Sequence, residues 1–143
     1  MRIGELAQMG QCTEQTVRYY EKKGLLPAAA RTEANYRIYD SAHVERLRFI
    51  RNCRALDMTH EEIRGLLDLM EQPASDCGGV NGLLDEHIAH VDARITELAA
   101  LKRQLAGLRE RCQSNQAVNE CGILEGLASM ETEPRRAPQS HLG

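Results

Sequence analysis

Apolar residues recur at helical spacing along the second half of the chain. Steps of four and three residues connect Leu84, Ile88, Val91, Ile95, Leu98, Leu101, Leu105, Leu108 and Cys112. This a/d-type seam of about four heptads predicts a long helix that packs lengthwise on another helix. Two consecutive three-residue steps around Leu98 form a stammer, which locally overwinds a coiled coil without ending it.

Cysteines flank this predicted helix. Cys77 lies just before it, Cys112 lies at its far end, and Cys121 follows a short polar loop. A helix of this length spans about 45–50 Å, so Cys77 and Cys112 cannot meet within one chain. In an antiparallel pair of chains, Cys77 of one copy falls beside Cys112 and Cys121 of the other. The pattern therefore predicts a homodimer with a three-thiolate pocket at each end of its axis.

Two short helices are predicted at the start of the chain. They cover Ile3–Gly10 and Glu14–Lys23, and Thr13 is a candidate N-cap for the second. Two short helices joined by a tight turn predict a helix-turn-helix, whose second helix enters the major groove of DNA. The candidates for DNA contact near the exposed side of that helix are Thr16, Arg18, Tyr19 and Tyr20.

A short strand of basic and aromatic residues follows. Residues 35–39 (NYRIY) alternate in the manner of a strand, after a loop that carries Arg31. A basic hairpin after a helix-turn-helix is typical of the wing of a winged helix, which rests on the DNA backbone. The candidates for phosphate contacts are therefore Arg31, Asn35, Tyr36 and Arg37.

Two further helices connect this head to the long helix. Asp40 or Ser41 caps the first, which runs to about Leu56 and carries Arg54, another candidate for DNA contact. Its inward residues are predicted to be Val44, Leu47, Ile50 and Cys53. Thr59-His60-Glu61-Glu62 predicts a capping box that opens the second helix. The apolar face of that helix is formed by Ile63, Leu66, Leu67 and Met70.

Charge is distributed unevenly along the chain. The net charge of −3 combines ten Lys/Arg and six Asp/Glu in residues 1–56 with eight Lys/Arg and fifteen Asp/Glu in the rest. A basic front half on an acidic chain indicates that the front half meets a polyanion. The sequence has no apolar run long enough for a membrane span and no signal peptide. Its five cysteines are then expected to be cytoplasmic thiols or metal ligands.

Several motifs together resemble the MerR family of bacterial metal-responsive transcription regulators. They are RIGELA at residues 2–7, TVRYYE at 16–21, GLLP at 24–27 and NYRIY at 35–39. LDMT at 56–59, DCG at 76–78, DEHI at 85–88 and ECGIL at 120–124 look most like the cadmium- and lead-responsive branch. The resemblance covers nearly all of residues 1–130.

The resemblance implies an all-α fold with a small β-wing: a winged helix-turn-helix head plus a long antiparallel coiled-coil dimerisation helix. The expected domains are a DNA-binding domain (1–70), a linker and dimerisation helix (71–112), a metal-binding loop with a short helix (113–130) and a disordered tail (131–143). The implied homodimer binds a pseudo-palindromic operator in promoter duplex DNA. When metal binds, it distorts the promoter for RNA polymerase and activates heavy-metal resistance genes.

The expected effector is Cd(II) or Pb(II), bound by Cys77, Cys112 and Cys121. Thiolates favour soft ions, and a third thiolate suits a divalent one. In the family, serine at the position of Cys77 marks sensors of monovalent ions. Zinc sensors carry an adjacent cysteine pair and a loop histidine, whereas this chain has Gln113 after Cys112 and no histidine between Cys112 and Cys121. The cysteine spacing also suits mercury sensors, so Hg(II) is the next alternative and Zn(II) a further one.

Asn81 and His87 are weaker candidates, as residues supporting the metal site, and His90 is left as a surface or supporting residue. A thiolate metal buffer or chaperone is the remoter functional alternative. Such a protein needs only the three-thiolate pockets, and this interpretation leaves the basic N-terminal half unexplained. An enzyme is not expected, since no Ser/His/Asp set or carboxylate pair falls in a plausible pocket.

Overall fold

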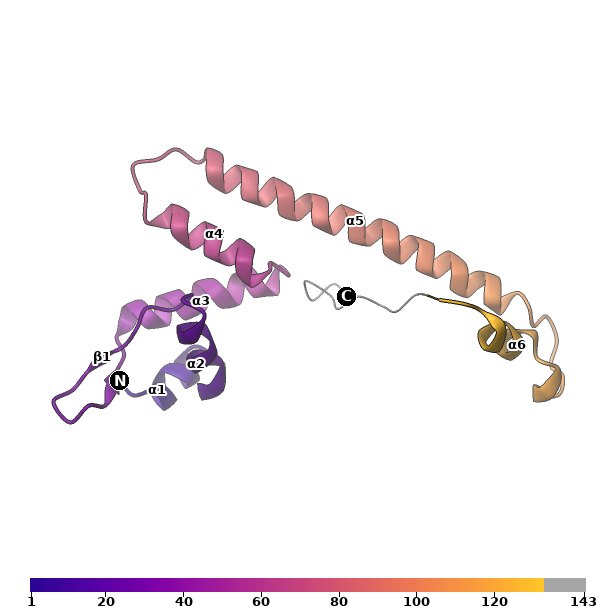
Figure 1. Ribbon diagram of the computed structural model, residues 1–143, viewed down its shortest axis with the longest axis horizontal. Coiled ribbons are helices and arrows are strands. Elements are labelled where there is room, and N and C mark those ends of the chain that lie inside the picture. The colour runs from indigo at the N-terminus through magenta and orange to yellow at the C-terminus, as the bar shows by residue number, and fades with distance from the viewer. Residues whose placement is uncertain (133–143) are drawn as a thin grey trace. The chain divides into compact units, whose positions relative to one another are not determined.

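The computed structural model describes residues 1–132, which are mostly helical with one two-stranded sheet. The elements are α1 (Ile3–Met9), α2 (Glu14–Lys22), β1 (Ala30–Arg31), β2 (Arg37–Ile38), α3 (Ser41–Ala55), α4 (His60–Met70), α5 (Gly78–Arg109), a 3₁₀ turn η1 (Val118–Glu120) and α6 (Gly122–Ser129). Figure 1 shows their order along the chain. The chain divides into two compact units, one ending at His87 and the other beginning at Ile88.

Three predicted helix caps are confirmed. The Thr13 hydroxyl accepts from the Thr16 N–H at 3.1 Å and so opens α2. The Thr59 hydroxyl accepts from the Glu62 N–H at 3.1 Å, and the Glu62 carboxylate accepts from the Thr59 N–H at 2.8 Å. At α3 the cap is Asp40, which forms a reciprocal capping box with His43. These bonds satisfy N–H groups that a helix start leaves without intrahelical partners.

The first unit contains two apolar clusters. The first cluster, in the N-terminal head, joins α1, α2, the end of the hairpin and the first half of α3; its buried members are Leu6, Ala7, Val17, Leu26, Tyr39, Val44 and Leu47. Tyr39, at the end of the predicted strand, is 1% exposed and anchors the hairpin to this core. The wing thus has a fixed base although its two strands are short.

The second cluster packs α3 against α4 and the start of α5. Its buried members are Leu25, Ile50, Cys53, Met58, Ile63, Leu66 and Leu67, with Leu83 of α5 packed against them. The predicted inward residues of α3 and α4 are therefore confirmed, except that Met70 is 54% exposed. Met70 is the last residue of α4 and lies beyond the cluster.

The first turns of α5 pack closely against α4. A Cβ placed on Gly79 would lie 2.9 Å from a Leu69 methyl carbon, and one on Gly65 would lie 3.1 Å from a Leu83 methyl carbon. Glycine at these two positions therefore lets the two helices approach closely. The Asp76 carboxylate accepts from the Gly78 N–H at 2.8 Å, so the chain enters α5 directly after Cys77.

The wing is an antiparallel hairpin in which Ala30 pairs with Ile38 and Arg31 with Arg37. Arg31 thus lies in a strand rather than in the expected loop. Asn35 at the turn has φ +67°, a left-handed conformation that asparagine tolerates better than most residues. The Asn35 N–H donates to the Thr32 carbonyl at 2.8 Å, which closes the turn.

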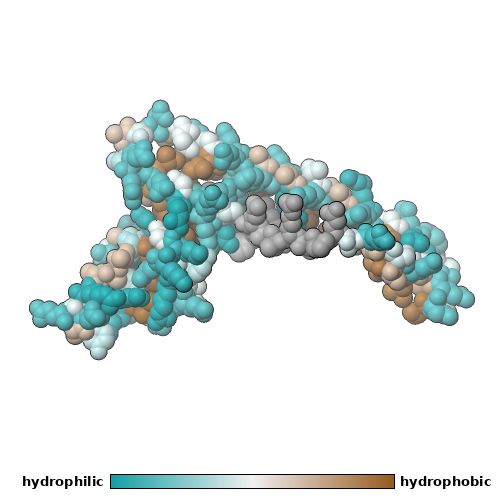
Figure 2. Space-filling model, in the orientation of Figure 1, coloured by the Kyte–Doolittle hydropathy of each residue, from teal (hydrophilic) through white to brown (hydrophobic). Residues whose placement is uncertain are grey.

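The second unit contains the rest of α5, η1 and α6. Figure 1 shows α6 folded back beside the C-terminal end of α5. The predicted long helix and short final helix are confirmed, and η1 interrupts the loop between them. Figure 2 shows apolar surface gathered at the α6 end of this unit, where Leu124, Leu127 and Met130 are each about half exposed.

No helix within residues 1–132 is both long and apolar enough to cross a membrane. The disorder predicted for residues 131–143 falls mostly on 133–143, which lie outside the described residues. The coiled-coil pairing involves a second chain and stays a prediction.

Candidate functional site

The helix-turn-helix presents polar side chains on α2. Arg18 is exposed and lies 3.8 Å from Glu14, one turn earlier on the same helix. Tyr19 is 42% exposed, and its ring lies 5.5 Å from that of His60 at the start of α4. Thr16 is half-buried, and its hydroxyl lies 2.9 Å from the Thr13 hydroxyl. Of the four α2 candidates, Arg18 and Tyr19 are the most available to a partner.

Tyr20 has a largely structural position. It packs against both apolar clusters of the first unit. Burial raises the pKa of its phenol, an effect that the nearby Arg54 partly offsets. Arg54 is half-buried and donates from Nη1 to the Met58 carbonyl at 2.6 Å, which ties together the corner between α3 and α4. Both candidates lie in the head, with side chains that also hold its fold.

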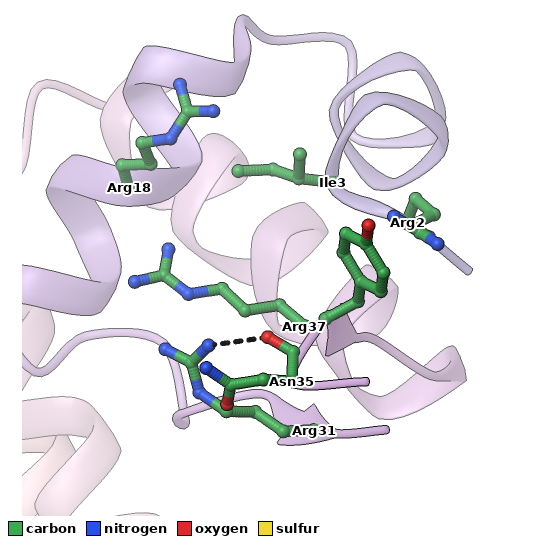
Figure 3. Close-up of a pocket in the computed structure, with 7 residues that line it drawn as sticks. Arg2, Ile3, Arg18, Arg31, Asn35 and Arg37 are labelled. Carbon is green, nitrogen blue, oxygen red and sulfur yellow. Dashed lines mark hydrogen bonds between the residues drawn. The ribbon is translucent and has the colours of Figure 1, made fainter. Parts of the chain in front are cut away.

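A cleft between α2, the wing and the start of the chain collects arginines. It has a volume of about 350 Å³ and is lined by Arg2, Ile3, Arg18, Arg31, Asn35, Tyr36 and Arg37. Figure 3 shows the Arg31 and Arg37 side chains extending toward the helix that carries Arg18. None of the lining residues is acidic, and four of them are arginines, two of which also pair with glutamates of α2. The cleft is therefore suited to an anion.

Hydrogen bonds and one ion pair orient the wing residues. Arg31 donates from Nη1 to the Asn35 carbonyl at 3.0 Å, as the dashed line in Figure 3 shows. Arg37 lies 3.7 Å from the Glu21 carboxylate of α2, and the same carboxylate accepts from the Tyr39 hydroxyl. Burial, followed by this hydrogen bond, raises the pKa of Tyr39. Glu21 thus connects the wing to α2.

Two of the candidate metal ligands lie together in the second unit. The Cys121 pKa is lowered chiefly by the backbone N–H of Leu124, then by that of Ile123, and further by a hydrogen bond with the Cys112 side chain. Cys121 is the N-cap residue of α6, so its sulfur lies at the positive end of the helix dipole, which favours the thiolate. The Cys112 thiol also donates to the Ser114 carbonyl at 3.4 Å.

A close backbone contact holds the loop between these two cysteines. A Cβ placed on Gly122 would lie 2.5 Å from the Arg111 carbonyl oxygen, far inside contact distance. Arg109 also donates from Nη1 to the Cys112 carbonyl at 2.8 Å. Glycine at position 122 is therefore required for α6 to begin beside the end of α5, where Cys112 and Cys121 meet.

The remaining candidates lie in the first unit. Cys77 is exposed one residue before α5, and Asn81 is exposed in its first turn, with its N–H donating to the Cys77 carbonyl at 2.9 Å. His87 is buried: Nε2 donates to the Leu56 carbonyl at 2.8 Å and Nδ1 lies 3.1 Å from the Glu62 carboxylate. His87 thus ties α5 to the corner between α3 and α4.

Comparison with known proteins identifies the family. Residues 1–69 match the model described as MerR HTH family regulatory protein, and residues 44–108 match the model described as MerR, DNA binding. A regulator from Haemophilus influenzae described as a ZntR homolog is 46% identical over 115 residues, covering 80% of this chain and 85% of that protein. The chain belongs to the MerR family of metal-responsive regulators.

Other relatives of this MerR-family protein carry different metal names. The Bacillus cereus mercuric resistance operon regulatory protein is 37% identical, with 88% of this chain and 96% of that protein covered. The crystal structure of PbrR691 from Ralstonia metallidurans CH34 with lead(II) has 54% identity and a TM-score of 0.81, covering 89% of this chain and 98% of that one. MerR of Bacillus megaterium MB1 with mercury(II) has 32% identity and a TM-score of 0.71, covering 90% of this chain and all of that one.

Sequence reasoning missed three residues that the structure places at these sites. Arg2 lines the arginine cleft, Glu21 orients Arg37, and Glu62 faces His87. Each acts through a contact with a residue far away in the sequence, and helical or strand periodicity carries no signal for such contacts. Only the capping-box pattern at Thr59 drew attention to Glu62.

The thiol environments predict an order of chemical reactivity. In the reduced, metal-free protein, Cys121 is expected to react with iodoacetamide at neutral pH about tenfold or more faster than Cys53, because the thiolate is the nucleophile. Burial raises the pKa of Cys53, whereas the Leu124 and Ile123 N–H groups lower that of Cys121. The rate of Cys121 alkylation should therefore stop rising with pH at a lower pH than the rate of Cys53 alkylation. Mass spectrometry of timed samples measures both rates, and equal rates would contradict this electrostatic description of the loop.

Proposed function

We propose that this MerR-family protein is a bacterial cytoplasmic regulator that binds promoter DNA as a homodimer and activates heavy-metal resistance genes in response to Cd(II) or Pb(II). The observation that carries the proposal is the close backbone contact between Gly122 and Arg111, which brings together the chain segments next to Cys121 and Cys112, two of the three predicted thiolate ligands. The 54% identity to the lead-bound PbrR691 structure supports the choice of metal.

The exposed seam of α5 supports the dimer. Seven apolar residues along this helix are 37% or more exposed in the single chain: Val80, Leu84, Ile88, Ile95, Leu98, Leu101 and Leu105. A continuous apolar stripe on a long helix is stabilised by packing against another helix. A second copy of α5, running antiparallel, supplies that helix. It also brings Cys77 of one copy toward Cys112 and Cys121 of the other.

The donor set fits a soft divalent ion. All five cysteines are free thiols in the structure, and the Cys121 environment favours the thiolate, which is the form that ligates metal. Cys112 and Cys121 would hold the ion from one chain and Cys77 from the other. A bound ion there supplies a link between the two chains. Three thiolates carry more negative charge than a monovalent ion can balance. The third thiolate therefore favours a divalent ion.

The first unit would carry the DNA-binding activity. The arginine cleft and α2 present cationic and hydrogen-bonding groups on one side of the head, as a winged helix requires for phosphate and base contacts. His87 and the Glu62 carboxylate connect the start of α5 to the α3–α4 corner of the same unit. A change at the end of α5 has a route to the head through these contacts. In the proposal it alters promoter geometry and thereby the fit of RNA polymerase.

Mercury(II) and zinc(II) are the alternatives to cadmium and lead. The mercuric regulator and the ZntR homolog among the relatives keep both open. The thiolate-only ligand set and the absence of histidine between Cys112 and Cys121 favour Cd(II), Pb(II) or Hg(II) over Zn(II). Competition among the four ions for the reduced dimer would rank them.

Replacing each proposed ligand tests the function. Cys77→Ser, Cys112→Ser and Cys121→Ser should each abolish metal-dependent transcription in vitro while leaving DNA affinity within about twofold of the parent. The loss of Cd(II) affinity should exceed the roughly 10–100-fold that removal of an outer-shell partner costs. Cys12→Ser is the matched control, because Cys12 packs against the head core. Full cadmium and lead responses in Cys77→Ser would contradict the three-ligand site.

The contact between Gly122 and the Arg111 carbonyl predicts a second, indirect way to weaken the metal site. Gly122→Ala should lower Cd(II) affinity by about 10–100-fold, comparable to the loss of an outer-shell partner, because the added methyl group forces Cys121 away from Cys112. Gly107→Ala is the matched control, since within the described residues nothing lies within 4 Å of its Cβ. Isothermal titration of both variants measures the difference. A Gly122→Ala protein that binds cadmium like Gly107→Ala would contradict the role assigned to this contact.

A further inference from the structure

The Arg2 side chain packs on the wing rather than on the helix that follows it in sequence. It is the N-cap residue of α1, but its side chain makes no capping hydrogen bond. The guanidinium carbon instead lies 4.0 Å from the centre of the Tyr36 ring on the wing. Arg2 and Tyr36 are both exposed, Tyr36 by 52%. A cation–π contact therefore holds Arg2 at the surface of the wing.

The backbone around Arg2 is fixed on both sides. The Tyr39 N–H donates to the Met1 carbonyl at 2.8 Å, so residue 1 lies beside the end of the hairpin. The Arg2 carbonyl accepts from the Leu6 N–H at 3.1 Å, which begins α1. Arg2 thus stands between two anchored elements, and its place beside the wing is set before any ligand arrives.

The hydrogen-bonding edge of Arg2 remains available for an anion. Stacking on an aromatic ring uses the flat face of a guanidinium, whereas its five N–H donors lie in the plane. Within residues 1–132, no carboxylate lies within 4.0 Å of the Arg2 guanidinium, in contrast to Arg18 and Arg37. Arg2 and Tyr36 both line the arginine cleft, and Figure 3 shows Arg2 at the border of that cleft.

We infer that Arg2 is a DNA-contact residue, which binds a backbone phosphate while Tyr36 holds its guanidinium in place. The inference rests on the proposed DNA-binding function and adds a residue from outside the helix-turn-helix and the wing. A planar, preorganised guanidinium is suited to bidentate phosphate binding, and its contact carries no base information. Arg2 therefore contributes to the affinity for duplex DNA and to its salt dependence, and this contribution is the same for all DNA sequences.

Equilibrium binding at several salt concentrations tests this assignment. The full-length parent, Arg2→Ala, Arg2→Gln and Arg2→Lys are titrated against a fluorescent duplex selected from a random pool by the parent. One phosphate contact per head predicts that Arg2→Ala and Arg2→Gln lower affinity about tenfold or more at low salt. They should also reduce the slope of log K against log salt by about 2 per dimer. Arg2→Lys keeps the charge and should retain most of the slope.

Controls separate this role from a structural one. Arg103→Ala removes the same charge from an exposed position on α5 and should leave the slope unchanged. If Arg2 only braces Tyr36, Arg2→Ala and Arg2→Gln keep the parent slope whatever their affinity, and this result overturns the inference alone. A parent that shows no salt-dependent binding to duplex DNA overturns the inference together with the proposed function. Arg2→Gln retains hydrogen-bonding capacity, so it provides the readout if Arg2→Ala fails to fold.

Discussion

The exposed apolar seam of α5 is the constraint on which the proposed dimer and its metal site depend. A helix of 32 residues carries apolar side chains along its length, and seven of them are exposed in the isolated chain. At about 25 cal/mol per Å² of apolar surface, water strongly favours covering such a stripe. In the proposed antiparallel dimer the stripe is covered by its own copy. The same pairing completes a ligand set that each chain supplies only in part.

The head and the thiol loop use different physical means to prepare their sites. In the head, hydrogen bonds, an ion pair and aromatic stacking position arginines around a cleft before an anion is present. In the loop, the α6 N-terminus stabilises the Cys121 thiolate and the Gly122 contact sets its approach to Cys112. The Glu62–His87 pair joins α4 to α5 within the first unit. Each site is preorganised, which reduces the conformational cost of binding.

Much of the fold could be predicted because its signals are local. The caps at Thr13 and Thr59, the inward face of α3 and the long seam of α5 all follow from spacing along the chain. The two-residue strand at Arg31 was missed because it depends on the left-handed turn at Asn35.

The candidate sites were predicted less completely. The spacing of the cysteines and the basic hairpin supplied the candidate residues, and the family resemblance supported them, but neither gave the contacts that orient these side chains. The contacts of Arg2 with Tyr36, of Glu21 with Arg37 and of Glu62 with His87 join residues 16 or more positions apart. Such pairs are created by tertiary packing, and no periodic pattern encodes them. The exposure of Met70 has the same origin, since it reflects where the neighbouring cluster ends.

Metal counting on a mixed dimer tests most directly whether the site is shared between chains. One chain carries Cys77→Ser, the other carries Cys112→Ser and Cys121→Ser, and two different affinity tags isolate the mixed species. If the site is shared between chains, one end of the mixed dimer has all three thiolates and the other end has none. The mixed dimer should then bind one cadmium ion tightly, half the parent stoichiometry, while neither homodimer binds tightly. A mixed dimer that binds no cadmium would contradict the account, because a site within one chain leaves both ends incomplete.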